Sequence, residues 1–275
     1  MKNLLKRSLS GIVFAAVVLA AIVIHPYIFA LIFVAFSILA LYEFYSLLEK
    51  IGFKPYRYQG IAAGIFIFIL FFLVTGKIVS QNLIILLILF PFILFLTELF
   101  SKIERGFENC LITLAGIIYI SIPFGILNFI VFPGSESVSV FYPWIMAGII
   151  FIIWVYDTVA YFTGSLIGKH KISSRISPKK SWEGFVGGSV FAVIMGILNA
   201  VLFSGLSMTR WIVVAIIVVA FGTCGDFFES KLKRAAGVKD SGNLMPGHGG
   251  MLDRFDSLLF SVPVIFIWLN LFGNI

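Results

Sequence analysis

Nine apolar bands divide this sequence, and each is long enough to cross a lipid bilayer as a helix. A spanning helix needs roughly 17–25 predominantly apolar residues. The bands are continuously apolar instead of alternating, which favours helices over a β-barrel. We place them at about 8–24, 27–48, 58–75, 82–100, 110–131, 143–165, 184–204, 210–229 and 257–273. The sequence therefore predicts an all-α, polytopic integral membrane protein, with a tight helical hairpin at His25-Pro26.

The composition excludes a soluble globular domain. Of the 275 residues, 60% are hydrophobic, 31 are phenylalanine and only 12% of the chain is charged. A soluble domain carries about 25% charged residues. The net charge of +7 does not indicate a nucleic-acid partner, because the basic residues fall in short loops between the bands. The two cysteines, Cys110 and Cys224, form no pattern typical of a disulfide framework or a zinc site.

The distribution of basic residues predicts the orientation. With a cytoplasmic N-terminus and nine crossings, only Lys77 and Arg210 of the 20 Lys and Arg residues fall on the outer side. This asymmetry is the one that the positive-inside rule requires. Two long polar loops, about 166–183 and 230–256, are then expected to face the cytoplasm.

The chain is expected to have two regions. Residues 1–142 would hold about five N-terminal spans, and residues 143–275 would form a C-terminal catalytic region with the two polar loops. The charged start of the chain, followed by an apolar run, is also the pattern of a cleaved signal peptide. No clear small-x-small cleavage site follows, so we expect the first band to be retained as a span.

One stretch, Ser230–Ser257, is far more polar than its surroundings. It holds five basic residues, three aspartates, one histidine and five glycines. Two pairs of acidic residues, Asp226/Glu229 and Asp253/Asp256, are each spaced three apart, which places both carboxylates of a pair on one helix face. If the pairs converge, they make an oxygen-rich site of the kind that suits Mg²⁺. A zinc site is disfavoured, because His248 has no Cys or His partner at ligand spacing.

The basic residues and glycines of the same stretch suit a substrate with several phosphate charges. Glycines such as Gly249 and Gly250 allow backbone N–H groups to approach a phosphate closely. Arginine and lysine bind phosphate oxygens directly. The candidates for this role are Lys233, Arg234, Lys239, His248 and Arg254. The alternative is an ordinary basic loop on the inner side of the membrane.

Three acidic residues elsewhere need separate explanations. Asp157 lies inside the sixth band, where an ionisable side chain is costly unless it faces a partner or a wet cavity. It is therefore a further candidate ligand, with a neutral packing role as the alternative. Glu43 and Glu98 lie near the ends of bands, where we expect them to reach water or a basic partner.

The second polar loop contains the sequence SPKKSWEG at 177–184. Ser177 and Pro178 suit the entry to a helix. Lys179 and Lys180 offer phosphate contacts, whereas Trp182 would stack on a base or lie at the membrane interface. Glu183 precedes the glycine-rich start of the seventh band. The candidate substrate-binding residues of this loop are Ser177, Lys179, Lys180, Trp182 and Glu183.

These motifs together resemble the phosphatidate cytidylyltransferase (CDP-diacylglycerol synthase) family. The resemblance rests on a long composite pattern: Ser230-x-Leu232-Lys233-Arg234, four residues, Lys239-Asp240, then Pro246-Gly247-His248-Gly249-Gly250, two residues, and Asp253-Arg254-x-Asp256. The segment 177–184 is similar to a second element of the family. The resemblance covers the C-terminal third of the chain, and the first five bands add only a compatible layout.

The resemblance implies an integral membrane enzyme that joins CTP and phosphatidic acid to give CDP-diacylglycerol and pyrophosphate. It also implies a Mg²⁺ requirement and a homodimer. The compact length and the absence of an organelle-targeting signal suggest a bacterial inner membrane, with the active site expected to face the cytoplasm. We expect Asp226, Asp253 and Asp256 to be metal ligands, with Glu229 and Asp157 as second choices, and the carboxylates leave room for one ion or two. His248 either donates a hydrogen bond to pyrophosphate or is held structurally by its glycine turn.

Two other functions fit parts of the sequence. A CTP-dependent lipid-alcohol kinase of the dolichol or phytol type would share the membrane location and the nucleotide site, but would release CDP instead of pyrophosphate. A transporter is suggested by nine spans and the intramembrane Asp157. Transporters bind substrate near the bilayer midplane, whereas the polar cluster of this chain is expected at one surface.

Overall fold

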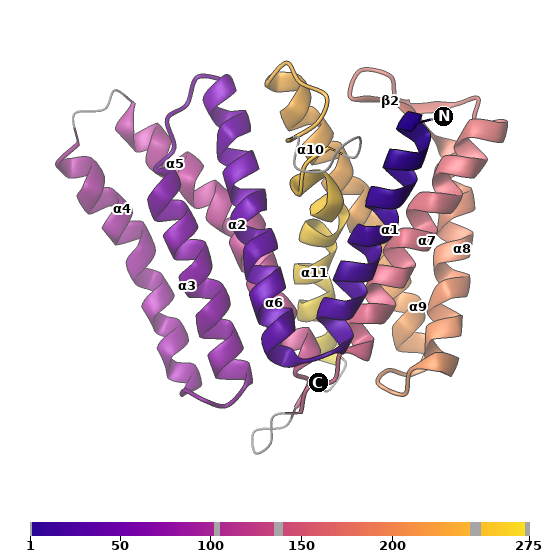
Figure 1. Ribbon diagram of the computed structural model, residues 1–275, viewed down its shortest axis with the longest axis horizontal. Coiled ribbons are helices and arrows are strands. Elements are labelled where there is room, and N and C mark those ends of the chain that lie inside the picture. Colours follow the sequence, from indigo (N-terminus) through magenta and orange to yellow (C-terminus); the bar gives the residue numbers. More distant parts are fainter. Residues whose placement is uncertain (1, 102–104, 135–139, 243–248, 273–275) are drawn as a thin grey trace.

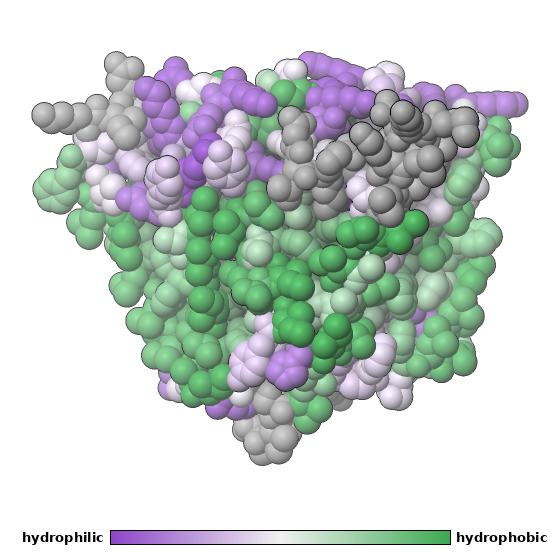
Figure 2. Space-filling model, in the orientation of Figure 1, coloured by the Kyte–Doolittle hydropathy of each residue, from purple (hydrophilic) through white to green (hydrophobic). Residues whose placement is uncertain are grey.

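The structure is a bundle of membrane-length helices. The computed structural model describes residues 2–101, 105–134, 140–242 and 249–272. Within these ranges, eight helices are long and apolar enough to span a membrane, and Ser10–Val23 forms a shorter apolar helix. The prediction of an all-α polytopic membrane protein is confirmed (Figure 1). Figure 2 shows an apolar belt around the visible face, with hydrophilic residues gathered mainly along one end.

Each of the nine predicted bands corresponds to one helical segment of the described chain. The first four segments are α1 (Lys2–Val23), α2 (Pro26–Lys50), α3 (Arg57–Thr75), and a 3₁₀ segment (Gln81–Ile88) that continues into α4 (Leu89–Leu99). The fifth combines α5 (Gly106–Gly116), a π-helical turn (Ile117–Ser121) and α6 (Ile122–Val131). The last four are α7 (Trp144–Ile167), α8 (Trp182–Leu202), α9 (Met208–Ile217) joined through a π-helical turn (Val218–Gly222) to α10 (Thr223–Ala235), and α11 (Leu252–Phe272).

The polar stretch 230–256 is only partly a loop. Helix α10 continues to Ala235, and α11 begins at Leu252, so both ends of the stretch are helical. The residues that extend α10 include lysine, leucine, arginine and alanine, which are good helix formers. The predicted boundaries followed the apolar bands, whereas the helices extend past them into the polar surface.

The turn at His25-Pro26 is as tight as expected. Helix α1 ends at Val23, and α2 begins at Pro26. Proline is well suited to the first helical position, because it has no N–H to leave unpaired there. The His25 side chain caps α2 by accepting the N–H of Tyr27 through Nδ1 at 3.3 Å.

The helices form two groups with α11 between them (Figure 1). Helices α2 to α6 lie on one side and α7 to α10 on the other. Helix α11 packs against α2 and α6 of the first group and against α10 of the second. Helix α1 crosses between the groups, because it packs against both α2 and α7. The first turn of α11 therefore lies where the two groups meet.

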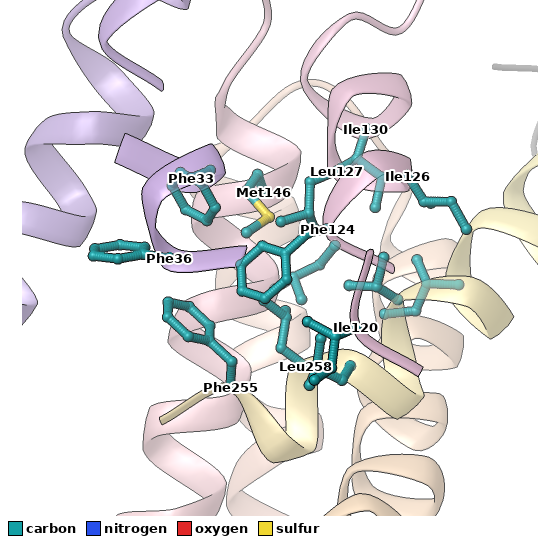
Figure 3. Packing of buried hydrophobic residues seen from close by; sticks show 14 of the residues in the cluster. Phe33, Phe36, Ile120, Phe124, Ile126, Leu127, Ile130, Met146, Phe255 and Leu258 are labelled. Carbon is teal, nitrogen blue, oxygen red and sulfur yellow. The ribbon is translucent and has the colours of Figure 1, made fainter. Parts of the chain in front are cut away.

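An aromatic cluster anchors that first turn (Figure 3). Phe255 of α11 is buried, and its ring centroid lies 5.3 Å from that of Phe36 in α2 and 5.2 Å from that of Phe124 in α6. Phe33 adds a further contact at 6.2 Å. Aromatic pairs at such distances contribute about 0.5–1.5 kcal/mol each beyond their area burial. Because Phe255 lies between Asp253 and Asp256 in sequence, this packing also fixes the two aspartates.

Close packing of α7 against α8 depends on small residues, as the Gly184/Gly188 spacing indicates. A Cβ atom at Gly188 would lie 2.9 Å from the Cβ atom of Ala160 and 2.9 Å from the ring of Tyr156, both on α7. These contacts are too short for a side chain to be accommodated without movement of the helices.

We predict that Gly188→Leu lowers the stability of the folded protein. Overpacking of this kind costs about 1–3 kcal/mol, and it is measurable as a lower midpoint of thermal unfolding in detergent. Val190→Leu on the same helix is the control, because Val190 is 52% exposed and should tolerate the change. Equal midpoints for the two variants would contradict the close approach of α7 and α8.

Candidate active site

A pocket opens where α7, α8, α10 and α11 meet a short β hairpin. Its volume is about 270 Å³, just below the range of roughly 300–1,000 Å³ typical of sites that enclose a whole ligand. A large substrate would therefore project from it. The lining residues include Tyr156, Asp157, Ala160, Tyr161, Lys179, Lys180, Phe185, Thr223, Asp226, Asp253 and Asp256.

Four aspartates from three helices line this pocket. Asp157 comes from α7, Asp226 from α10, and Asp253 and Asp256 from α11. Asp157, Asp226 and Asp256 line the same pocket although each comes from a different helix. The structure thus brings together the intramembrane aspartate and members of both carboxylate pairs that the sequence singled out.

Negative charge at the pocket is only partly compensated. The Lys180 ammonium forms an ion pair with the carboxylate of Asp226 and lies 4.5 Å from the ring centroid of Phe227. Asp157 makes no hydrogen bond or ion pair within the described residues, although the charges of Lys180 and Arg254 act on it. Asp256 accepts the backbone N–H of Ser257 at 2.7 Å. The pocket therefore has capacity for additional positive charge.

Asp253 is held differently, since both of its carboxylate oxygens are engaged. Oδ1 lies 2.5 Å from Nζ of Lys233. Oδ2 accepts three hydrogen bonds, from the N–H of Ser241 at 2.9 Å, the hydroxyl of Ser241 at 2.8 Å and the N–H of Gly250 at 2.8 Å. Asp253 consequently has a structural role in this arrangement as well as a place in the pocket wall.

Lys233 connects α10 to α11 by pairing with two carboxylates. Its Nζ lies 2.5 Å from Oε2 of Glu229 as well as 2.5 Å from Oδ1 of Asp253. The side chain of Glu229 is only 1% exposed and does not line the pocket. Of the pair Asp226/Glu229, only the aspartate is directed to the pocket. Lys233 neutralises buried charge behind the pocket wall.

The remaining basic candidates differ in their position. Lys179 and Lys180 both line the pocket. Arg234 donates to the carbonyl of Val238 at 3.1 Å and is exposed, as is Lys239. Arg254 does not line the pocket, but its charge acts on Asp157. The hairpin lysines are thus the basic side chains best placed to contact a substrate inside the pocket.

The loop that carries these lysines contains an antiparallel hairpin. Strand β1 (Lys171–Ser173) pairs with β2 (Ser177–Ser181). The expected helix entry at Ser177-Pro178 is wrong, because α8 begins at Trp182, where Ser181 Oγ accepts the N–H of Gly184 at 3.2 Å. Ser181 is the better cap, since its side chain reaches the first free N–H groups of the helix.

Three other candidates of this loop, Ser177, Trp182 and Glu183, do not line the pocket. Oε1 of Glu183 lies 2.6 Å from Nδ1 of His170, and both of its oxygens accept the backbone N–H of His170 at 3.2 Å. Glu183 therefore closes the base of the hairpin. Trp182 is 53% exposed and packs against Phe185, with ring centroids 5.8 Å apart.

Part of the glycine-rich motif cannot be placed. Pro246, Gly247 and His248 lie outside the described residues. Gly249 adopts a positive φ of 84°, and Gly250 donates its N–H to Asp253. Within the described chain, these two glycines serve the fold of the loop and do not line the pocket.

A magnesium ion is chemically compatible with the pocket carboxylates. Among the described residues, no group of three or more His, Cys, Asp and Glu side chains already surrounds one ion position. Mg²⁺ usually binds through one or two carboxylates together with water and substrate phosphates, so a complete protein cage is not required. Asp157, Asp226 and Asp256 supply carboxyl oxygens to one pocket, which fits that requirement.

Sequence reasoning missed the role of Glu43. This α2 residue was expected to reach water or a basic partner, but it is only 8% exposed and accepts hydrogen bonds from Ser241, Met251 and Leu252. Glu98, for which the same was expected, accepts a hydrogen bond from the Tyr56 hydroxyl. The sequence signal available for Glu43 was that it is the one charged residue inside the band 27–48.

We predict that Lys233→Met destabilises the fold much more than Lys180→Met. Removal of Lys233 leaves the buried Glu229 and Asp253 without their counter-ion, and breaking a buried ion pair costs about 3–5 kcal/mol. The Lys180–Asp226 pair is partly exposed, so its loss should cost at most about 1 kcal/mol. Thermal unfolding of both variants in detergent gives the comparison. Equal destabilisation, or a larger effect for Lys180→Met, would contradict the assignment of Lys233 as a structural cation.

Comparisons with known proteins identify one family. Residues 5–272 match the family described as "Cytidylyltransferase family". Proteins named phosphatidate cytidylyltransferase from Staphylococcus haemolyticus and Staphylococcus aureus are each 38% identical to this chain over 185 residues. The protein of that name from Staphylococcus saprophyticus is 39% identical over 185 residues. Each alignment covers 66% of this chain and 68% of the relative.

Proposed function

The chain belongs to the cytidylyltransferase family, and from this premise we propose that it transfers CMP from CTP to phosphatidic acid, giving CDP-diacylglycerol and pyrophosphate. The observation that carries the proposal is the pocket between membrane-length helices that Asp157, Asp226 and Asp256 line together with Lys179 and Lys180 of the hairpin. Carboxylates and lysines at such a position suit the transfer of a phosphate group between a water-soluble nucleotide and a lipid.

The lining of the pocket matches two substrates of different polarity. Tyr156, Ala160 and Phe185 supply apolar and aromatic surface, and the lysines and aspartates supply charge. Tyr161 also lines the pocket and is 68% exposed on α7. In a bilayer, that side of the pocket would border lipid, whereas the hairpin side would border water.

In the reaction, a phosphate oxygen of phosphatidic acid attacks the α-phosphorus of CTP. A bond forms between these atoms, and the bond from the α-phosphorus to the oxygen bridging the α- and β-phosphates breaks. The bonding electrons leave with pyrophosphate. Because the attacking phosphate is already ionised, the reaction needs positioning and charge neutralisation more than a protein nucleophile.

Lys179 and Lys180 are assigned to bind phosphate oxygens. Both stand on β2 at the pocket wall, and Lys180 already pairs with a carboxylate there. Asp226, Asp256 and Asp157 would hold Mg²⁺, which when bound supplies positive charge to the triphosphate. Lys233 would keep the helices that carry these aspartates together, and Arg254 would balance the charge of Asp157.

The membrane and the side that the pocket faces can also be inferred. The positive-inside rule favours a cytoplasmic pocket, where CTP is available. A bacterial inner membrane agrees with the staphylococcal origin of the relatives. We also propose that the protein acts as a homodimer, as the family resemblance implies, and cross-linking of the purified protein tests this point.

We predict that the purified protein converts CTP and phosphatidic acid into a lipid that retains the cytidine and α-phosphate label. Pyrophosphate should be released in equal amount. Release of CDP with a γ-labelled lipid would instead identify a lipid kinase, and a folded protein that forms neither product would overturn the proposal. Asp256→Asn should lower the rate by about 100-fold or more, as expected for loss of a charged group that acts in the transition state.

The proposed metal can be tested by removal and titration. After treatment with EDTA, we expect no product, and added Mg²⁺ should restore activity along a saturation curve. Asp157→Asn should require several-fold more Mg²⁺ for half-maximal activity, because one oxygen donor loses its charge. Full activity after EDTA treatment would exclude a role for a dissociable metal ion, and an unchanged titration would exclude Asp157 as a ligand.

A further inference from the structure

Glu43 is an acidic residue of the N-terminal helix group that makes contact with the catalytic half of the chain. It lies on α2, is only 8% exposed and does not line the pocket. A buried carboxylate is costly unless hydrogen-bond donors compensate it. Its partners therefore indicate why the fold retains it.

Within the described chain, Glu43 has three hydrogen-bond donors, and all of them belong to the polar stretch Ser230–Ser257. Oε1 accepts the N–H of Met251 at 2.9 Å. Oε2 accepts the N–H of Leu252 at 2.9 Å and the hydroxyl of Ser241 at 2.9 Å. Met251 and Leu252 lie at the start of α11, where free N–H groups favour a negative partner. The Glu43 carboxylate on α2 therefore caps the N-terminus of α11, a helix far from it in sequence.

These contacts involve residues on both sides of 243–248, a segment outside the described residues. Ser241 lies before the segment 242–250, and Met251 lies directly after it. The Ser241 hydroxyl has one proton, and Oδ2 of Asp253, 2.8 Å from its oxygen, shares that proton with Glu43. Oδ2 of Asp253 also accepts the N–H of Gly250 at 2.8 Å. Glu43 and Asp253 thus both contact the chain before and after this segment, and Asp253 lines the pocket.

The two glycines at the ends of this segment leave space for the carboxylate. A Cβ atom at Gly250 would collide with Oε2 of Glu43 and with the Ser241 hydroxyl, and one at Gly242 would collide with Oε1 of Glu43. The backbone at these two glycines therefore lies directly against the Glu43 carboxylate. The glycines are required here for close approach, independently of any phosphate contact.

We propose that Glu43 is a positioning residue for cytidylyl transfer. By holding Ser241 and the first turn of α11, it fixes the placement of Asp253 and, through the same turn, of Asp256. The proposal rests on the proposed function and extends it, because it gives the N-terminal helix group a direct role in the geometry of the pocket. Glu43 itself does not line the pocket and is not a catalytic residue.

Glu43→Gln is the most direct test. It preserves the size of the side chain but leaves one acceptor oxygen for three donors. We expect kcat to fall about 10–100-fold, the range typical of residues that orient a ligand-binding side chain. The KM for CTP should change less than about threefold, because Lys179 and Lys180 stand on the hairpin, which Glu43 does not contact. Amide hydrogen exchange at Met251 and Leu252 should accelerate, with unchanged exchange in α3.

Glu49→Gln is the matched control on the same helix. Glu49 pairs with Arg57 at the surface, 2.6 Å from its guanidinium nitrogen, so kcat and exchange near α11 should remain those of the wild type. A wild-type kcat for Glu43→Gln would overturn the proposal. So would a loss of activity accompanied by faster exchange throughout the bundle, since that result would indicate a general structural role.

Ser241→Ala decides the question if Glu43→Gln does not fold. It removes only the hydroxyl shared by Glu43 and Asp253, and we expect kcat to fall about 3–10-fold with local acceleration of exchange near residue 241. An unchanged kcat in this variant would also overturn the proposal. If the wild type forms no CDP-lipid, the proposed function fails together with the catalytic part of the inference, whereas exchange at Met251 and Leu252 still tests the Glu43 contacts separately.

Discussion

The first turn of α11 is held by buried charges that originate on other helices, and the pocket depends on this arrangement. Lys233 connects it to α10 through Asp253, and Glu43 connects it to α2 through two backbone N–H groups. Phe255 adds an aromatic contact with α2 and α6. A buried charge without a partner costs free energy, so few arrangements of these helices satisfy every carboxylate in the network. This limits the positions that the pocket aspartates can occupy.

The transmembrane part of the fold was predictable because its signal is local. Each band is recognised by its own length and apolarity, which the bilayer requires irrespective of the neighbouring helices. The ends of α10 and α11 were not predictable in the same way. Helix α11 begins at Leu252 with a cap supplied by Glu43, a residue more than two hundred positions earlier in the chain. The β hairpin was missed because the expected helix entry at Ser177 took no account of strand pairing with 171–173.

The candidate site was predictable in residue type but not in the direction of each side chain. A spacing of three places Asp226 and Glu229 on one helix face, yet Asp226 lines the pocket and Glu229 is directed to Lys233. The basic residues of the polar stretch suggested phosphate contacts, whereas Lys233 is occupied by two carboxylates. Which lysine serves a substrate and which serves the fold depends on packing between helices. That information is absent from spacing within one helix.

The charged residues that stabilise the fold are different from those that are available to bind substrate. Behind the pocket wall, Lys233 pairs with two carboxylates, and Glu43 receives three hydrogen bonds, so these acids are compensated by the protein. Asp157 at the pocket has no hydrogen bond or ion pair from the described residues, and it lies within the electrostatic reach of Asp226. A cation that arrives with a polyphosphate would pair with this carboxyl group and its neighbours, so part of the interaction energy becomes available only when the substrates are bound. The compensated acids make this possible, since they hold the helices together while Asp157 has no hydrogen bond or ion pair from the described residues.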